Sequence, residues 1–184
     1  MRFHGVFLGN RYEIWSKQHN GKVRQNTVTA FWKTRQAEGF DAGTRSSGRM
    51  EALRRVATLA QPALSQAGAT SLDLGCGTGL FADLVGVRSL IGVDVSDTLL
   101  VSARERMETV LQHDIFDLPF AACSTDNIVS LFVIDDYPSE QKAVFFNHVF
   151  ALLKPGSHCF RSCRMRRLLA ASGVSPLLMD CQLA

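Results

Sequence analysis

The sequence predicts an α/β fold in which helices cover both faces of a doubly wound, mostly parallel sheet of the Rossmann-like kind. From residue 71 onward, short apolar runs suited to strands alternate with helical patterns, which implies crossover connections between parallel strands. The first of these runs leads into a glycine-rich turn, and a helical pattern opens at Leu80. That order forms the nucleotide-binding corner of such sheets. At 184 residues the chain fits one domain with a sizeable core.

The glycine-rich turn indicates the kind of ligand. Gly75, Gly77 and Gly79 alternate with small residues, and glycine lets a backbone approach a ligand with no Cβ in the way. The spacing differs from the Gly-x-Gly-x-x-Gly of dinucleotide enzymes. Asp73 lies two residues before Gly75, where its carboxylate can accept from the ammonium of a bound amino acid or anchor the amides of the turn. A pyrophosphate would be repelled there, which disfavours a nicotinamide dehydrogenase.

A second acid ends the next apolar run. Asp94 lies 19 positions after Gly75, close to the roughly 20 expected for the acid that binds ribose hydroxyls. A carboxylate suits this task because it can accept both hydroxyl protons. The alternative is that Asp94 caps the helix expected over residues 97–107, although Ser96 can cap that helix equally well.

Other elements follow from apolar spacing and from breakers. Helices are expected over residues 27–38, 49–60 and 140–153, and residues 39–48 are interpreted as a Gly/Ser/Thr linker. One strand is expected within residues 176–183, too little chain for a seventh strand, so the C-terminal edge of the sheet is expected to be shortened. The buried face predicted for the 49–60 helix comprises Met50, Leu53, Val56, Ala57 and Ala60. That predicted for the 140–153 helix comprises Ala143, Phe146, Val149, Phe150 and Leu153.

Two of these segments resemble motifs of a known family. Residues 72–79, LDLGCGTG, are similar to the first motif of the class I S-adenosylmethionine-dependent methyltransferases, and residues 92–96, GVDVS, to the second. Segments similar to later parts of that fold follow in order at residues 112–120, 126–130 and 152–156. The resemblance covers roughly residues 45–160 and is closest to the small-molecule branch often called type 11. It implies S-adenosylmethionine as cofactor and methyl transfer to an O, N or C atom of a small-molecule acceptor.

The resemblance also implies roles for particular residues. Asp73 would lie near the cofactor's ammonium, Asp94 at the ribose hydroxyls and Asp114 at the exocyclic amine of adenine. The complete set of expected cofactor-binding residues is Asp73, Gly75, Cys76, Gly77, Gly79, Asp94, Val95, Asp114, Ile115 and Ser130. Within this set Cys76 is interpreted as a packing residue of the turn, and Val95 and Ile115 could equally be plain core.

The catalytic residues are less clearly indicated. A general base is needed only if the acceptor atom must lose a proton during transfer. Asp135, Asp136 and Tyr12 are the candidates, and the alternative for the two acids is that they cap the loop into the next helix. The aromatic residues before position 33, such as Trp15 and Trp32, would form a lid over the acceptor or pack as ordinary core. We therefore expect residues 1–48 to form an N-terminal helical lid or linker and residues 49–184 the cofactor-binding domain.

Composition bears on partners and location. The segment 161–184 holds four arginines against the single acid Asp180, which accounts for the whole net charge of +3. No aromatic residues are interleaved with these arginines to stack bases, so nucleic acid is a disfavoured partner. No apolar run approaches the roughly 18 residues that a membrane span needs. The shortened edge of the sheet leaves a homodimer possible.

Cysteine and histidine usage bears on redox compartment and metals. The five cysteines include no Cys-x-x-Cys pair, and their odd number argues against a disulfide framework, so we expect a cytoplasmic protein, with an organelle transit segment as the alternative. The histidines are too scattered to predict a metal site. Because the sheet is expected to be short, a non-catalytic S-adenosylmethionine-binding or scaffold protein is the alternative to an enzyme.

Overall fold

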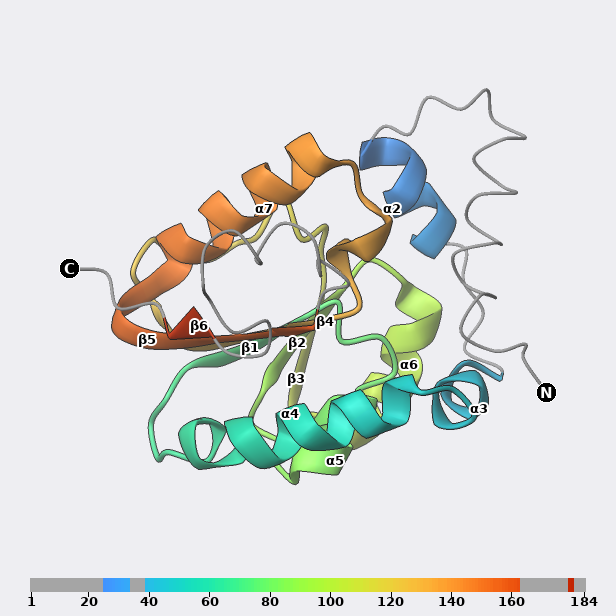
Figure 1. The fold of residues 1–184 in the computed structure, drawn as a ribbon, viewed down its shortest axis with the longest axis horizontal. Coiled ribbons are helices and arrows are strands. Elements are labelled where there is room, and N and C mark those ends of the chain that lie inside the picture. Colours follow the sequence, from blue (N-terminus) through green and yellow to red (C-terminus); the bar gives the residue numbers. More distant parts are fainter. Residues whose placement is uncertain (1–24, 34–38, 163–178, 181–184) are drawn as a thin grey trace.

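The protein is an α/β sandwich built on one six-stranded sheet (Figure 1). A computed structural model describes residues 25–33, 39–162 and 179–180. The strands lie in the order β3-β2-β1-β4-β5-β6; the first five are parallel, and β6 pairs antiparallel with β5. The strands are β1 (Ser71–Leu74), β2 (Ile91–Asp94), β3 (Thr109–Gln112), β4 (Thr125–Leu131), β5 (Leu153–Ser162) and β6 (Met179–Asp180). The doubly wound α/β fold is therefore confirmed.

Helices cover both faces of the sheet. The helices are α2 (Gln25–Lys33), α3 (Phe40–Arg45), α4 (Arg49–Leu64), α5 (Leu80–Val85), α6 (Asp97–Arg106) and α7 (Ser139–Leu152), with a short 3-10 helix η1 (Ile134–Asp136). In Figure 1, α7 and α2 lie on one side of the sheet, and α4 and α5 lie on the other. Two apolar clusters fill the spaces between these layers. One lies between the sheet and helices α4, α5 and α6, and the other lies between the sheet and helices α2 and α7.

Of the two predictions for the segment before β1, one is correct and one is wrong. All five residues predicted for the buried face of α4 are buried, together with Leu64, because the helix runs beyond residue 60. The interpretation of residues 39–48 as a linker is wrong, since residues 40–45 form α3. Gly39 starts this helix with a φ of 69°, and Asp41 in the first turn complements the positive end of the helix.

The buried face predicted for helix α7 is correct in part. Val149 and Leu153 are buried, and Phe146 and Phe150 pack against the core. Ala143 is exposed, however, and Phe145 and Leu152, which were not predicted, are buried. Apolar side chains surround this helix on most sides, so spacing alone does not identify which side faces the sheet. The helix passes directly into β5, so Pro155 lies inside a strand.

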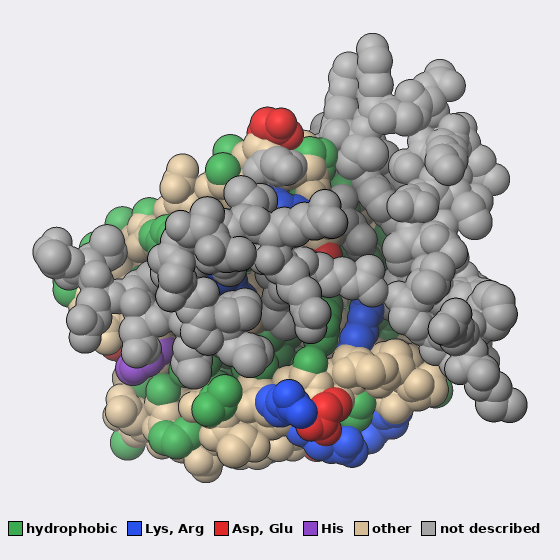
Figure 2. Space-filling model, viewed as in Figure 1, with side chains coloured by type: hydrophobic (Ala, Val, Ile, Leu, Met, Phe, Trp, Pro, Cys, Tyr) green, Lys and Arg blue, Asp and Glu red, His purple; other side chains and the backbone are tan. Residues whose placement is uncertain are grey.

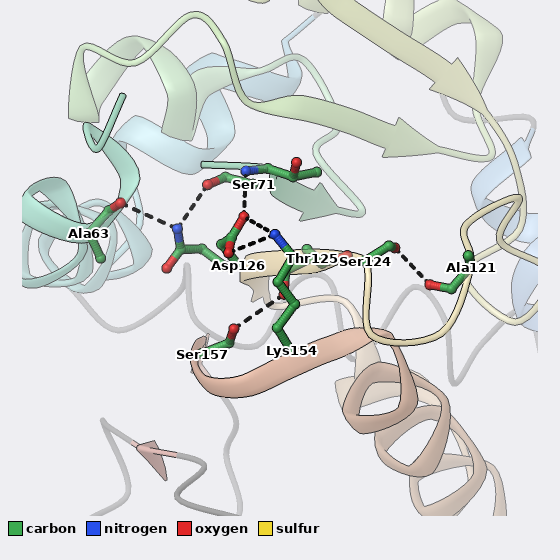
Figure 3. A network of polar contacts seen from close by, with 10 residues as sticks. Ala63, Ser71, Ala121, Ser124, Thr125, Asp126, Lys154 and Ser157 are labelled. Carbon is green, nitrogen blue, oxygen red and sulfur yellow. Dashed lines mark hydrogen bonds and ion pairs between the residues drawn. The ribbon is translucent and has the colours of Figure 1, made fainter. Parts of the chain in front are cut away.

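A polar network ties the strands together at the end of the sheet where β1 and β4 begin (Figure 3). The Asp126 carboxylate accepts from the Thr70 backbone N–H at 2.9 Å and pairs with Lys154 Nζ at 2.8 Å. The Asn127 side-chain amide donates to Ser71 Oγ at 3.0 Å and to the Ala63 carbonyl at 3.3 Å. These contacts fix α4, β1, β4 and β5 in register and leave the opposite end of the sheet for ligands.

The C-terminal edge is short in the part of the chain that the structure describes. The strand expected within residues 176–183 is present as β6, two residues long, and it pairs Met179 with Cys159 and Asp180 with His158. No seventh strand occurs among the described residues.

Candidate functional site

The glycine turn after β1 is held against the neighbouring strands by backbone hydrogen bonds. The amides of Gly75 and Cys76 both donate to the Val93 carbonyl, at 2.7 and 3.0 Å. Gly75 has a φ of 75°, and a Cβ at this position would lie 2.3 Å from Cγ2 of Val133, which follows β4. Only glycine therefore lets the turn after β1 approach the segment after β4 this closely.

Asp94 supports the same turn from the end of β2. One oxygen of its carboxylate accepts from the Gly77 N–H at 2.8 Å, and the other accepts from the Ser96 N–H at 2.9 Å. Burial raises the pKa of Asp94, and these backbone hydrogen bonds counteract part of that rise. Ser96 caps α6, since its Oγ accepts from the Leu99 N–H at 3.4 Å. The capping role considered for Asp94 thus belongs to Ser96.

Asp73 is the unusual acid of the site. It lies in the middle of β1 and is 2% exposed, and its Oδ2 has no hydrogen-bond partner among the described residues. Burial, and to a lesser extent the charge of Asp94, raise the pKa of Asp73 to about 7. A buried carboxylate with an unused oxygen is costly unless a donor or a cation meets it. Asp73 is therefore suited to receive a cationic group of a ligand.

Asp114 lies just after β3 and is fixed by two donors. The Thr29 hydroxyl of α2 donates to one carboxylate oxygen at 2.9 Å, and the Phe116 N–H donates to the other at 3.1 Å. Each carboxylate oxygen has two lone pairs, so both can still accept from a ligand. Helix α2 thus contacts the site directly instead of only lying over it.

One cavity of about 120 Å³ lies at the carboxyl ends of β1, β2, β3 and β4 and brings most of the predicted residues together. In doubly wound sheets, ligands bind at this edge, where the strand order reverses between β1 and β4. The predicted residues that line the cavity are Asp73, Gly75, Cys76, Gly77, Asp94, Val95, Asp114 and Ile115. The other two predicted residues, Gly79 and Ser130, do not line it; Gly79 starts α5, and the Ser130 hydroxyl is buried without a partner among the described residues.

Of the three candidate catalytic residues, the structure describes the side chain of Asp135 alone. Asp135 is half-buried in η1 and is absent from the cavity wall, and its backbone carbonyl accepts from Lys142 Nζ at 3.0 Å. Tyr12 and the side chain of Asp136 lie outside the described residues. Tyr137, the next residue, is buried and does line the cavity.

The sequence reasoning missed several residues of the cavity wall. Arg49, the first residue of α4, is the one cationic side chain among the described lining residues, and its guanidinium carbon lies 5.1 Å from the ring centroid of Phe132. A basic residue at a helix start carries no signal of its own in the sequence. Phe40, Phe132 and Tyr137 were not predicted either. Together with Trp32, which the sequence analysis named as a candidate lid residue, they give the wall an aromatic part.

Comparison with known proteins finds a related family. Residues 72–156 match the family model described as "Methyltransferase domain". This part of the chain is therefore similar to methyltransferase domains. The match confirms the resemblance to the S-adenosylmethionine-dependent methyltransferases, whose cofactor is S-adenosylmethionine. A comparison with curated proteins gave no match.

Several solved structures share the fold. An S-adenosylmethionine-dependent methyltransferase from Methanococcus maripaludis is 17% identical, with a TM-score of 0.56, and the match covers 69% of this chain and 62% of that one. One from Mesorhizobium loti is 24% identical, with a TM-score of 0.50 and coverage of 65% and 55%. The [4+2]-cyclase SpnF is 22% identical, with a TM-score of 0.53 and coverage of 64% and 47%. The chain thus spans less than two thirds of the length of each of these structures.

The residues of this cavity fit S-adenosylmethionine. The unused Asp73 Oδ2 suits an ammonium, and Asp94 and Asp114 supply acceptors for hydroxyls and an amine. In the described ranges no three His, Cys, Asp or Glu side chains gather into a possible metal site. No helix among the described residues has the length and apolarity to cross a membrane.

Proposed function

We propose that this protein transfers a methyl group from S-adenosylmethionine to an O, N or C atom of a small-molecule acceptor. The observation that carries the proposal is the convergence of three strand-end acids and a glycine turn on one cavity. Asp73 and Asp94 lie in β1 and β2 and Asp114 lies just after β3, and all three line the cavity.

Different residues of the cavity would bind different parts of the cofactor. Asp73 would receive the ammonium, Asp94 the ribose hydroxyls and Asp114 the adenine amine. Arg49 is placed to pair with the carboxylate of the amino-acid part, because it is the cation of the described cavity wall. When bound, the cofactor supplies a methyl group on a cationic sulfur, which departs as a neutral thioether.

The protein's own contribution would be binding, orientation and the exclusion of water. Fixing the acceptor beside the methyl group can contribute roughly 7–11 kcal/mol in well-oriented systems. Aromatic side chains from three segments, Trp32, Phe40 and Phe132, surround the cavity and would hold an apolar or aromatic part of the acceptor. No general base is assigned, since Asp135 lies away from the cavity wall.

The proposed partner of the protein is a small-molecule acceptor. An acceptor of low molecular weight fits a cavity enclosed by helices α2, α3 and α4. Basic and acidic side chains lie next to each other on the described surface over α4, including the pair Arg55 and Glu51, so that surface is not the uniformly basic one that nucleic acid favours (Figure 2). The homodimer and the cytoplasmic location expected from the sequence stay predictions.

The alternative is a protein that binds S-adenosylmethionine without transferring its methyl group. One observation favours it: a solved structure that shares the fold is a cyclase. A fold of this kind therefore does not by itself establish methyl transfer.

Incubating the protein with S-adenosylmethionine labelled in its methyl group and a metabolite extract separates the two functions. The proposal predicts label in a small molecule and release of S-adenosylhomocysteine, both lost in Asp94→Ala. Tight cofactor binding with no label transferred would instead establish the non-catalytic alternative.

A further inference from the structure

Three side-chain and backbone contacts join the N-terminal helix α3 to the glycine turn. The Thr78 hydroxyl in the turn donates to the Asp41 carboxylate of α3. Arg106, the last residue of α6, pairs with the other Asp41 oxygen through Nη2 at 2.7 Å and donates from Nη1 to the Thr78 carbonyl at 3.0 Å. Asp41, Thr78 and Arg106 thus form a closed ring, and each comes from a different element.

This ring fixes the turn that forms one wall of the cavity, and Thr78 itself lines that cavity. Thr78 is 3% exposed and lies between Gly77, whose amide donates to Asp94, and Gly79, which starts α5. Phe40, beside Asp41, covers the turn, since a Cβ at Gly77 would lie 3.4 Å from its ring. A shift of Asp41 would therefore move both the wall of the cavity and the backbone donor of Asp94.

The burial of the ion pair between Arg106 and Asp41 distinguishes it from an ordinary surface ion pair. The side chains of Arg106 and Asp41 are 24% and 23% exposed, whereas those of the helical pair Arg55–Glu51 are 66% and 61% exposed. Exposed pairs contribute little, but a partly buried pair with several charge-assisted hydrogen bonds fixes geometry as well as energy. Helix α3 also lies outside the matched residues 72–156, so the family model does not include it.

We propose that Asp41 is a positioning residue of the cofactor site: through Thr78 and Arg106 it holds α3 against the glycine turn and so sets the affinity for the cofactor. This inference rests on the proposed function, because its readout is cofactor binding. Asp41 does not line the cavity, so its effect is indirect. Thr29 of α2 has a parallel contact with Asp114, so both N-terminal helices reach the site.

The test is the dissociation constant for S-adenosylhomocysteine, measured by titration calorimetry. Asp41→Ala and Thr78→Val should each weaken binding about tenfold, in the usual range for coupling between sites. Thr78→Ser keeps the hydroxyl and should bind like the wild type. The double variant Asp41→Ala/Thr78→Val should be little weaker than either single variant, because both remove the same ring.

Two further variants separate positioning from general stability. Asp126→Asn breaks a partly exposed ion pair at the far end of the sheet and should lower the melting temperature without changing the dissociation constant. Asp41→Asn keeps the size of the side chain, and it should weaken binding even if Asp41→Ala does not fold. Wild-type protein that fails to bind would refute the proposed function. Binding by the wild type together with unchanged binding by Asp41→Asn, or additive effects in the double variant, would overturn this inference.

Discussion

Replacing Asp73 by asparagine should stabilise the ligand-free protein while weakening its hold on the cofactor. The side chain of Asp73 is buried, and its pKa is raised from 3.8 to about 7. Because the carboxyl pKa is higher in the folded state than in the unfolded state, ionisation of Asp73 disfavours folding. The free energy of unfolding therefore falls as the pH rises from the unfolded pKa of 3.8 to the folded pKa of about 7, and then levels off. The cost at pH 8 is roughly 4 kcal/mol and at pH 5 roughly 2 kcal/mol.

Urea unfolding of wild type and Asp73→Asn at pH 5 and pH 8 measures this cost. The variant should be more stable at both values, with the larger gain at pH 8. Asp126→Asn is the control of opposite sign, because a hydrogen bond from Lys154 lowers the pKa of Asp126. That carboxylate contributes stability above its unfolded pKa and loses it as the pH falls through the lower folded value, so the variant should be less stable at neutral pH.

The same group links cofactor affinity to pH. A cationic ammonium favours the ionised form of Asp73, so binding should release a proton from the fraction of molecules in which Asp73 is protonated. From a pKa near 7, affinity should fall roughly twentyfold between pH 7.5 and pH 5.5. Calorimetry in buffers of different ionisation enthalpy detects the proton. Equal stability of Asp73→Asn and wild type at pH 8, with no proton released on binding at pH 6.5, would refute the reasoning.

Three other substitutions test separate contacts of the site. Gly75→Ala should lower the free energy of unfolding by about 1–3 kcal/mol, since it adds strain at positive φ and a clash with Val133, and Val133→Ala should restore part of the loss in urea unfolding. Arg49→Met should weaken S-adenosylhomocysteine binding about tenfold but leave adenosine binding unchanged, whereas loss of both would mean that Arg49 only supports the fold. Thr29→Val removes a hydrogen bond to Asp114 and should cost about 1 kcal/mol of binding free energy in calorimetry, while Thr58→Val on the exposed side of α4 should cost none.

The sequence was most informative where one residue type has one physical use. Glycines at tight spacing and acids at strand ends identified the cavity, because glycine adopts positive φ most easily and a carboxylate is the side chain that accepts without donating. The buried face of α4 followed from its clean spacing. The buried face of α7 did not follow fully from spacing, because apolar residues such as Val144 and Phe150 lie around the helix. The burial of Phe145 depends on how the helix packs on the sheet.

Contacts between distant segments could not be predicted in this way. Residues 39–48 are rich in small polar residues and look like a linker, yet α3 forms there, where Asp41 meets Thr78 and Arg106. Nothing in the local sequence signals a partner 37 or more positions away. Arg49 and Thr29 enter the site for the same reason, since both depend on how the N-terminal helices pack.

The central claim is that this cavity binds S-adenosylmethionine through its strand-end acids. Titration calorimetry of the wild type and Asp94→Ala with S-adenosylmethionine tests it most directly. We predict one site per chain in the wild type and binding weakened at least roughly tenfold in the variant, because two charge-assisted hydrogen bonds to the ribose are lost. Equal affinity in the two proteins, or no binding by the wild type, would contradict the account.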